Sequence, residues 1–222
     1  MITLIVGSDQ REAVVYHTFC QSVLEKTSQP VAFVPLADNA LACVKPAQND
    51  GSNKFTYSRF LTPYLMGFDG WAIYADGDMI CQEDIANLWA LRDESKAVMV
   101  VKHDYQTIAT TKYLGSVNAD YPRKNWSSLV LWNCGHPKNK VLTPEFVGQA
   151  TGANLHRFTW LDDEDIGELD KSWNWLVQEY PNNRKAKILH YTLGSPCFKD
   201  YENVDTADIW DHCFERLTTG MQ

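Results

Sequence analysis

Short apolar runs alternate with segments of helical periodicity along this chain, and the alternation leaves few fold classes open. Residues 2–6 are apolar and lead into a turn at Gly7, Ser8 and Asp9. Asp9 and Glu12 have the spacing of a helix capping box, and apolar residues recur at helical spacing behind them. With a second apolar run at 31–36, the chain opens as strand, helix, strand. We expect an α/β fold with a mainly parallel, Rossmann-like sheet flanked by helices, formed as a single domain over residues 1–222.

Two aspartates, Asp76 and Asp78, follow the apolar run 71–75 with only Gly77 between them. Ligand sites of such folds lie at the carboxyl ends of strands. Unpaired carboxylates there lose hydration without compensation, and a divalent cation supplies the missing positive charge. Oxygen ligands suit Mg²⁺ or Mn²⁺, and Gly77 lets the backbone approach a ligand closely. The stretch favours metal-dependent chemistry on an anionic substrate, although the bare tripeptide is equally typical of a turn.

Arg59 precedes this pair on a segment, residues 55–65, whose pattern predicts a helix ended or kinked by Pro63. An arginine on an apolar helix commonly packs its stem on the core and exposes its charge. The alternative is a guanidinium directed at a phosphate or at a carboxylate of the site.

His190 ends a late apolar run at 188–190, and Gly194 follows four residues later. The imidazole is a candidate third metal ligand, and backbone amides after Gly194 are candidates to cradle a phosphate. A lone histidine is more often structural, so that interpretation stays open.

Four consecutive acids occupy positions 162–165, ahead of a segment, 166–176, that we expect to be partly helical. Such a run usually forms a solvated face or a helix N-terminus. The apolar residues on both sides also allow a partly buried carboxylate that orients sugar hydroxyls or acts as a nucleophile or base.

Composition excludes several classes of function. The formal charge of −8 argues against a general nucleic-acid binder. No run approaches the ~20 apolar residues of a membrane span, and the first residues lack the basic region of a signal peptide. The six cysteines are scattered without a Cys-x-x-Cys, which favours reduced thiols and a cytoplasmic protein.

The order of these pieces resembles glycosyltransferase family 8, the glycogenin-like and bacterial lipopolysaccharide-type sugar-nucleotide transferases. The resemblance runs from Ile2 to about Tyr201 and is strongest from Arg59 through Asp78. It implies the GT-A nucleotide-diphospho-sugar transferase fold. It also implies that Asp76, Asp78 and His190 bind a metal, typically Mn²⁺, that bridges the diphosphate of a UDP-sugar.

Further roles follow from the same resemblance. The first turn would hold the uracil and ribose, and Arg59 would contact the phosphate and sugar. Asp163 and Glu164 correspond to an acidic motif near the reacting carbon and are the implied catalytic acids, and Arg59 is the third implied catalytic residue. The residues assigned to the donor in this way are Val6, Gly7, Ser8, Asp9, Arg59, Asp76, Gly77, Ser127 and Gly194.

The chain departs from the family pattern at two of these places. The segment that contacts the donor sugar would be Ser127, Ser128 and Leu129, which lacks the family's Asn and Gly. The late motif has Ser195 and Pro196 where a lysine and a proline are usual, and Lys199 is the candidate substitute for that lysine.

The leading hypothesis is a metal-dependent hexosyltransferase that moves a hexose from a UDP-sugar to a carbohydrate or other hydroxyl acceptor, with retention of configuration. The cation would stabilise charge on the leaving diphosphate. One alternative is a phosphatase of the haloacid dehalogenase type, in which one aspartate of the pair is the nucleophile. The other is a non-catalytic nucleotide-sugar-binding protein. No pattern specifies the acceptor, the donor sugar, the oligomeric state or whether Glu164 attacks covalently.

Overall fold

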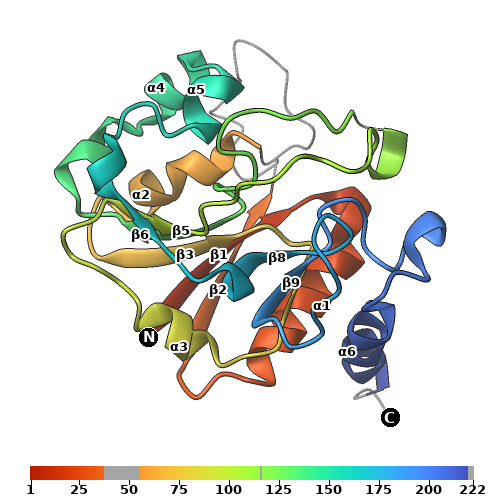
Figure 1. Cartoon of the computed structure of the whole chain (residues 1–222). Coiled ribbons are helices and arrows are strands. Elements are labelled where there is room, and N and C mark those ends of the chain that lie inside the picture. The colour runs from red at the N-terminus through yellow and green to blue at the C-terminus, as the bar shows by residue number, and fades with distance from the viewer. Residues whose placement is uncertain (38–55, 116, 220–222) are drawn as a thin grey trace.

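The computed structural model describes residues 1–37, 56–115 and 117–219, and its centre is a six-stranded sheet (Figure 1). The strand order is β2-β1-β3-β6-β5-β7, and only β6 runs antiparallel to its neighbours. These strands are β1 (Ile2–Ser8), β2 (Val31–Ala37), β3 (Trp71–Ala75), β5 (Val98–Val100), β6 (Leu129–Asn133) and β7 (Ile166–Glu168). The mainly parallel α/β sheet is confirmed.

The opening unit forms as its pattern predicts. β1 pairs in parallel with β2 over its full length, and α1 (Ala13–Leu24) connects them after a short 3-10 turn, η1 (Gln10–Glu12). The Asp9 side chain caps that turn by accepting a hydrogen bond from the Arg11 backbone N–H. The other half of the expected capping box is replaced, because the Glu12 carboxylate accepts from the Tyr113 hydroxyl instead.

Two predicted helices differ from expectation. Of residues 55–65, residue 55 lies outside the described part, and the rest forms a 3-10 turn, η3 (Ser58–Leu61), followed by α2 (Thr62–Leu65). Pro63 lies in the first turn of α2, where its missing N–H costs no hydrogen bond, so it starts this helix and does not end it. The segment expected to be partly helical begins with β7, continues as a 3-10 turn, η7 (Lys171–Asn174), and ends with β8 (Trp175–Leu176).

Helices cover both faces of the main sheet (Figure 1). Phe19 of α1 and Leu88 of α3 (Ile85–Trp89) share one buried cluster with Ile73 of β3. Phe60 of η3, α4 (Pro144–Gln149) and α5 (Gly152–His156) share the other cluster with Tyr74. Ile73 and Tyr74 point to opposite faces, as neighbours on a strand must, so β3 is buried from both sides.

A second, smaller sheet joins the end of β3 to the late part of the chain. Its order is β4-β9-β8, with β4 (Met79–Cys81) antiparallel to β9 (Ile188–His190). The helix α6 (Ala207–Thr219) packs beside α1 and this sheet (Figure 1). The remaining 3-10 turns are η4 (Tyr113–Gly115), η5 (Pro137–Val141), η6 (Asp163–Asp165) and η8 (Lys199–Tyr201). Among the described residues, no helix has the length and apolar character needed to cross a membrane.

Candidate functional site

The candidate site lies where β1, β3 and β6 meet at one edge of the main sheet. Val6 of β1 is opposite Ala75 of β3, which is opposite Leu129 of β6. Asp76 extends this pairing by one residue, because its backbone N–H donates to the Ser128 carbonyl at 2.8 Å. The sheet therefore fixes the backbone of the first aspartate before any ligand is present.

The second sheet brings His190 to Asp78 from more than a hundred residues away. Met79 pairs with His190, which leaves the imidazole Nε2 3.3 Å from Oδ1 of Asp78. The other ring nitrogen, Nδ1, lies 2.9 Å from Oδ1 of Asn174. Because an amide oxygen only accepts, Nδ1 carries a proton, and Nε2 is the nitrogen that faces the aspartate.

The three side chains suit a divalent cation. One ligand atom each from Asp76, Asp78 and His190 lies within 4.8 Å of the others. Oδ1 of Asp78 is buried and accepts no hydrogen bond from the described residues. A buried carboxylate oxygen without a partner is costly, and coordination of a cation is a direct way to satisfy it. Two carboxylates and one imidazole are a donor set that Mn²⁺ or Mg²⁺ accepts.

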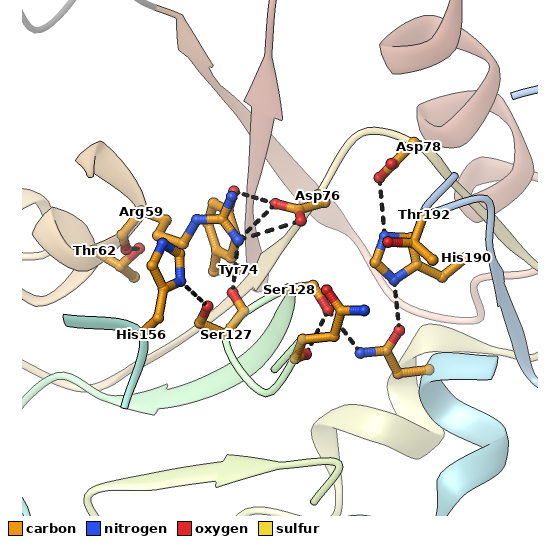
Figure 2. A network of polar contacts seen from close by, with 12 residues as sticks. Arg59, Thr62, Tyr74, Asp76, Asp78, Ser127, Ser128, His156, His190 and Thr192 are labelled. Carbon is orange, nitrogen blue, oxygen red and sulfur yellow. Dashed lines mark hydrogen bonds and ion pairs between the residues drawn. The ribbon is translucent and has the colours of Figure 1, made fainter. Parts of the chain in front are cut away.

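Arg59 points at Asp76 from the opposite side, as Figure 2 shows. Its Nη1 lies 3.1 Å from Oδ1 and 3.2 Å from Oδ2 of the aspartate, and it also donates to the Ser127 carbonyl at 3.1 Å. The Tyr74 hydroxyl donates to Oδ1 of Asp76 at 2.6 Å. Arg59 is only 5% exposed, so the guanidinium is turned inward and is not a surface charge.

The two aspartates are electrostatically different. Burial raises the pKa of Asp76 above its ordinary value, and Arg59 only partly offsets this. Burial also acts to raise the pKa of Asp78, but His190, with smaller contributions from Lys112 and a backbone hydrogen bond, outweighs it, and the pKa ends below the ordinary value. Asp78 is accordingly the more readily ionised member of the pair, and a bound cation would favour ionisation of both.

Lys112 is a site residue that the sequence did not indicate. Its Nζ donates to Oγ1 of Thr192 at 3.1 Å, and its side chain borders the cavity that contains the metal-ligand group. That cavity has a volume of about 100 Å³ and is lined by Thr56, Arg59, Asp76, Asp78, Lys112, Tyr113, Tyr121, Asn125, Ser127, Ser128, His156, His190 and Thr192. Lys199, the predicted substitute for the missing late lysine, is exposed on η8 and is absent from this lining.

The predicted donor-binding turn after β1 is close to the aspartates. Gly7 and Asp9 line a small hollow that also reaches Gly77 and Asp78. Val6 is fully buried in the core, so its side chain is structural and only its backbone is near the site. Ser8 is half-buried and has no place in the lining of this hollow.

Glu12 and Tyr113 close the same hollow, and neither was predicted as a site residue. The Tyr113 hydroxyl donates to the Glu12 carboxylate. Burial, and to a smaller degree the nearby Asp78, raises the pKa of Glu12 to about 7, even though the Tyr113 hydrogen bond lowers it. The pair is a titratable contact next to the metal-ligand group.

Of the predicted donor-binding residues Ser127 and Gly194, only Ser127 lines the cavity. Ser127 lines the cavity, its carbonyl accepts from Arg59, and its Oγ lies 2.7 Å from Nδ1 of His156. Gly194 is packed against the Tyr201 ring, which a Cβ would approach to 2.5 Å, and its N–H donates to the Tyr191 carbonyl. Gly194 therefore has a packing role, and the phosphate cradle formed by the backbone amides after it stays a prediction.

Asp163 and Glu164, the implied catalytic acids, lie away from the cavity. They belong to η6, which directly precedes β7. Ile166 at the start of β7 pairs with Val98 of β5. Val98 in turn pairs with a residue of β6 that pairs with Ala72, near the start of β3. The aspartates follow the far end of β3, about one strand length or ~15 Å further along the sheet.

The surroundings of η6 agree with this placement. The Asp163 side chain is 89% exposed and pairs with Arg123, and the Glu164 carbonyl accepts from Lys96. Neither acid lines the cavity of the metal-ligand group. The structure does not bring these two acids to the metal-ligand group: the acidic run precedes a strand and not a helix, and it lies at the opposite edge of the sheet. Their catalytic role stays a prediction.

Known proteins resemble this chain in sequence or in fold. The model of glycosyl transferase family 8 matches residues 8–135. Protein CDI of Arabidopsis thaliana is 43% identical over 216 residues, which are 93% of this chain and 83% of that protein. The galactosyltransferase LgtC, solved with donor and acceptor sugar analogues, superposes with a TM-score of 0.64 at 11% identity, covering 98% of this chain and 96% of LgtC. The bifunctional glycosyltransferase WbbM superposes with a TM-score of 0.63 at 16% identity, and this chain spans half of that protein.

These likenesses define the fold as the GT-A fold of glycosyltransferases. The match over more than half of the chain, together with the Arabidopsis relative, defines the family. The chain belongs to glycosyl transferase family 8.

Proposed function

We propose that this chain is a hexosyltransferase that uses a UDP-sugar donor and a divalent cation, Mn²⁺ or Mg²⁺, to glycosylate a hydroxyl acceptor. The observation that carries the proposal is the convergence of Asp76, Asp78 and His190 around Oδ1 of Asp78, a buried carboxylate oxygen that accepts no hydrogen bond from the described residues. Family membership supports a glycosyltransferase and displaces the phosphatase hypothesis. LgtC, which has the same fold, was solved with donor and acceptor sugar analogues.

When bound, the cation supplies positive charge to the diphosphate as the bond to the sugar breaks. The protein adds two fixed cations of its own. Lys112 reaches the cavity from the side of Asp78 and Thr192, in the role that the family's late lysine would have. Arg59 holds Asp76 in place through contacts of its Nη1 with both carboxylate oxygens, and the rest of its guanidinium charge is available to the sugar-phosphate region of the donor.

The donor nucleoside is proposed to lie over the turn after β1. Gly7 and Asp9 line the adjacent hollow, and Gly77 brings the backbone of the two strands close together. Opening of the contact between Tyr113 and Glu12 would enlarge this hollow, which is very small in the present structure.

Retention of configuration is part of the proposal. Asp76 and Asp78 are the acids that line the metal-site cavity, and both are assigned to the cation. With Asp163 and Glu164 removed from the site, the described lining offers no further carboxylate as a covalent nucleophile. The acceptor hydroxyl is proposed to attack from the face of the leaving diphosphate, which takes its proton.

Single-domain organisation and a cytoplasmic location complete the proposal. Cys20, Cys81, Cys134, Cys197 and Cys213 are free thiols in the described part of the chain, which supports a reducing compartment.

The test is UDP release from UDP-glucose and UDP-galactose, with and without Mn²⁺, together with binding of UDP in the presence of Mn²⁺. The variant is Asp78→Asn, which removes one ligand charge and keeps the side-chain size. The matched control is Asp69→Asn, because Asp69 is an exposed aspartate on the turn before β3. We expect Mn²⁺-dependent UDP release that is lost in Asp78→Asn and kept in Asp69→Asn.

Two other outcomes are informative. Release of UDP by Asp78→Asn at the parent rate would refute the metal assignment. Tight Mn²⁺-dependent binding of UDP without release from any UDP-sugar would favour the non-catalytic binding protein.

A further inference from the structure

A second cavity of about 310 Å³ adjoins the metal-ligand cavity and is larger than it. The two cavities share Thr56, Lys112, Tyr121 and His156 in their walls. The second one extends away from the aspartates between α5 and the loop that carries residues 117–124. Its size is in the range of small-molecule sites, which begins at about 300 Å³. A molecule bound there would meet a donor held at the aspartates across this shared wall.

The lining of the second cavity is cationic. It contains Lys112, Lys124 and Arg157, and none of its described residues is an aspartate or glutamate. None of these three cations forms an ion pair with a carboxylate in the described part of the chain. The chain as a whole has a formal charge of −8, so the cationic lining of this cavity is opposite in sign to the net charge of the protein.

The contacts of Lys124 show that neutral groups hold it. Its Nζ donates to Oδ1 of Asn118 at 2.6 Å and to the Ala119 carbonyl at 2.9 Å. Burial lowers the pKa of Lys124 to about 8, so the ammonium is still mostly protonated near neutral pH. A negative group on a ligand would offset this effect of burial by Coulombic attraction to the ammonium.

Arg157 has unused hydrogen-bonding capacity at the same wall. Its Nε is buried and donates to no acceptor in the described residues. Buried donors of this kind are rare and costly when they stay unsatisfied. A phosphate or carboxylate group is the acceptor that matches a guanidinium best.

We propose that the second cavity binds an acceptor substrate that carries both a hydroxyl and an anionic group, either a phosphate or a carboxylate. The anionic group lies against Lys124 and Arg157, and the hydroxyl points to the shared wall at Tyr121 and His156. This inference rests on the proposed transferase function and adds the chemical class of the acceptor. In the transfer, the acceptor oxygen forms a bond to the anomeric carbon as the bond from that carbon to the diphosphate oxygen breaks. The electron pair leaves with UDP, and the acceptor's proton goes to the UDP phosphate.

The experiment compares three probes on the whole chain with UDP and Mn²⁺ present: glucose, glucose 6-phosphate and glucuronate. Binding is measured by calorimetry, and transfer from UDP-glucose is measured in parallel. We expect at least one charged probe to bind about tenfold more tightly than glucose, as one charge-assisted hydrogen bond would give. The two charged probes separate a phosphate site from a carboxylate site.

Variants test which residues cause the preference for a charged probe over glucose. Arg157→Gln should reduce the preference for the charged probe by about fivefold or more, and Arg157→Lys should restore part of it. Lys140→Gln removes an exposed lysine of η5 that borders neither cavity, and should leave the preference as in the parent.

Equal binding of glucose and both charged probes to the parent overturns the inference, whether or not Arg157→Gln folds. A higher KM of Arg157→Gln for UDP-glucose, with an unchanged acceptor preference, also overturns it by assigning the cationic wall to the donor. If UDP-glucose releases no UDP with Mn²⁺, the transferase proposal fails on its own, and the calorimetric comparison still decides whether the cavity prefers anions.

Discussion

Replacing Gly77 with alanine should separate the two strand ends that hold the metal-ligand group. A Cβ at this position would lie 2.6 Å from the backbone carbonyl oxygen of Gly7. An ordinary van der Waals contact begins at 3.4 Å, so the ends of β1 and β3 must move apart by about 0.8 Å. A backbone oxygen in a paired strand has no flexible side chain that could yield in its place.

The displacement is large compared with what a metal site accepts. Metal–ligand distances are reproducible to about ±0.2 Å, and Gly77 lies directly between Asp76 and Asp78. We expect the affinity for Mn²⁺ to fall by about tenfold or more, as when the supports of metal ligands are removed. Overpacking of this kind costs about 1–3 kcal/mol of unfolding free energy, and 2 kcal/mol corresponds to a Tm lower by about 4–8 °C at this chain length.

Gly135→Ala is the matched control for Gly77→Ala. Its nearest neighbour would be 3.7 Å from the added Cβ, an ordinary contact, and Gly135 follows the other end of β6. Calorimetric titration with Mn²⁺ and thermal unfolding of both variants give the result. If Gly77→Ala matches both the parent and Gly135→Ala in Mn²⁺ affinity and in Tm, the close approach of β1 and β3 does not constrain the site.

Three further predictions concern individual side chains. Lys112→Met should raise the KM for the UDP-sugar by about tenfold, because a charged contact to the diphosphate is lost, whereas Lys199→Met should change it less than twofold; steady-state kinetics that show the reverse would restore Lys199. For Glu12, whose pKa is raised from 4.5 to about 7, the unfolded chain ionises first, so its contribution to stability is present below pH 4.5 and is lost as the pH rises through 7. Urea unfolding from pH 5 to 8 should therefore show a decline in the parent relative to Glu12→Gln, of about 3 kcal/mol at most, and parallel curves would contradict the shift. Glu164→Gln should keep UDP-sugar turnover within about twofold of the parent, and a hundredfold loss would return this residue to the site.

Local sequence signals were sufficient to predict the opening strand-helix-strand unit of the fold. β1, α1 and β2 were predictable because the apolar periods and the Asp9 cap lie within a few residues of each other. β7 was not predictable in the same way. It has three residues and is held by parallel pairing with β5, which lies about seventy residues earlier. Tertiary pairing of this kind overrides the local preference of a short segment.

The residues of the candidate site also differ in whether local sequence signals predict them. Asp76, Asp78 and His190 could be predicted to lie together because the two aspartates follow an apolar run and His190 ends one. Lys112 follows no such run, because it lies in an irregular loop. Only the cavity that it borders in the folded chain indicates a role for it. The acidic run before β7 is the opposite case: its residue types fit the family motif, but the strand that follows places it at the edge of the sheet away from the metal-ligand group.

The structure also changes the argument about why this site needs a cation. Asp76 is compensated within the chain, because Arg59 and Tyr74 occupy positions around both of its oxygens. Asp78 depends on the state of His190. A protonated His190 ring lowers the pKa of Asp78, whereas a neutral ring whose Nδ1–H is accepted by Asn174 turns the lone pair of Nε2 toward Oδ1, which accepts no hydrogen bond from the described residues. A lone pair beside a carboxylate oxygen is unfavourable unless a positive charge lies between them. The demand for a cation therefore arises at Asp78 and His190, and Asp76, already oriented by Arg59, is the ligand that completes the set.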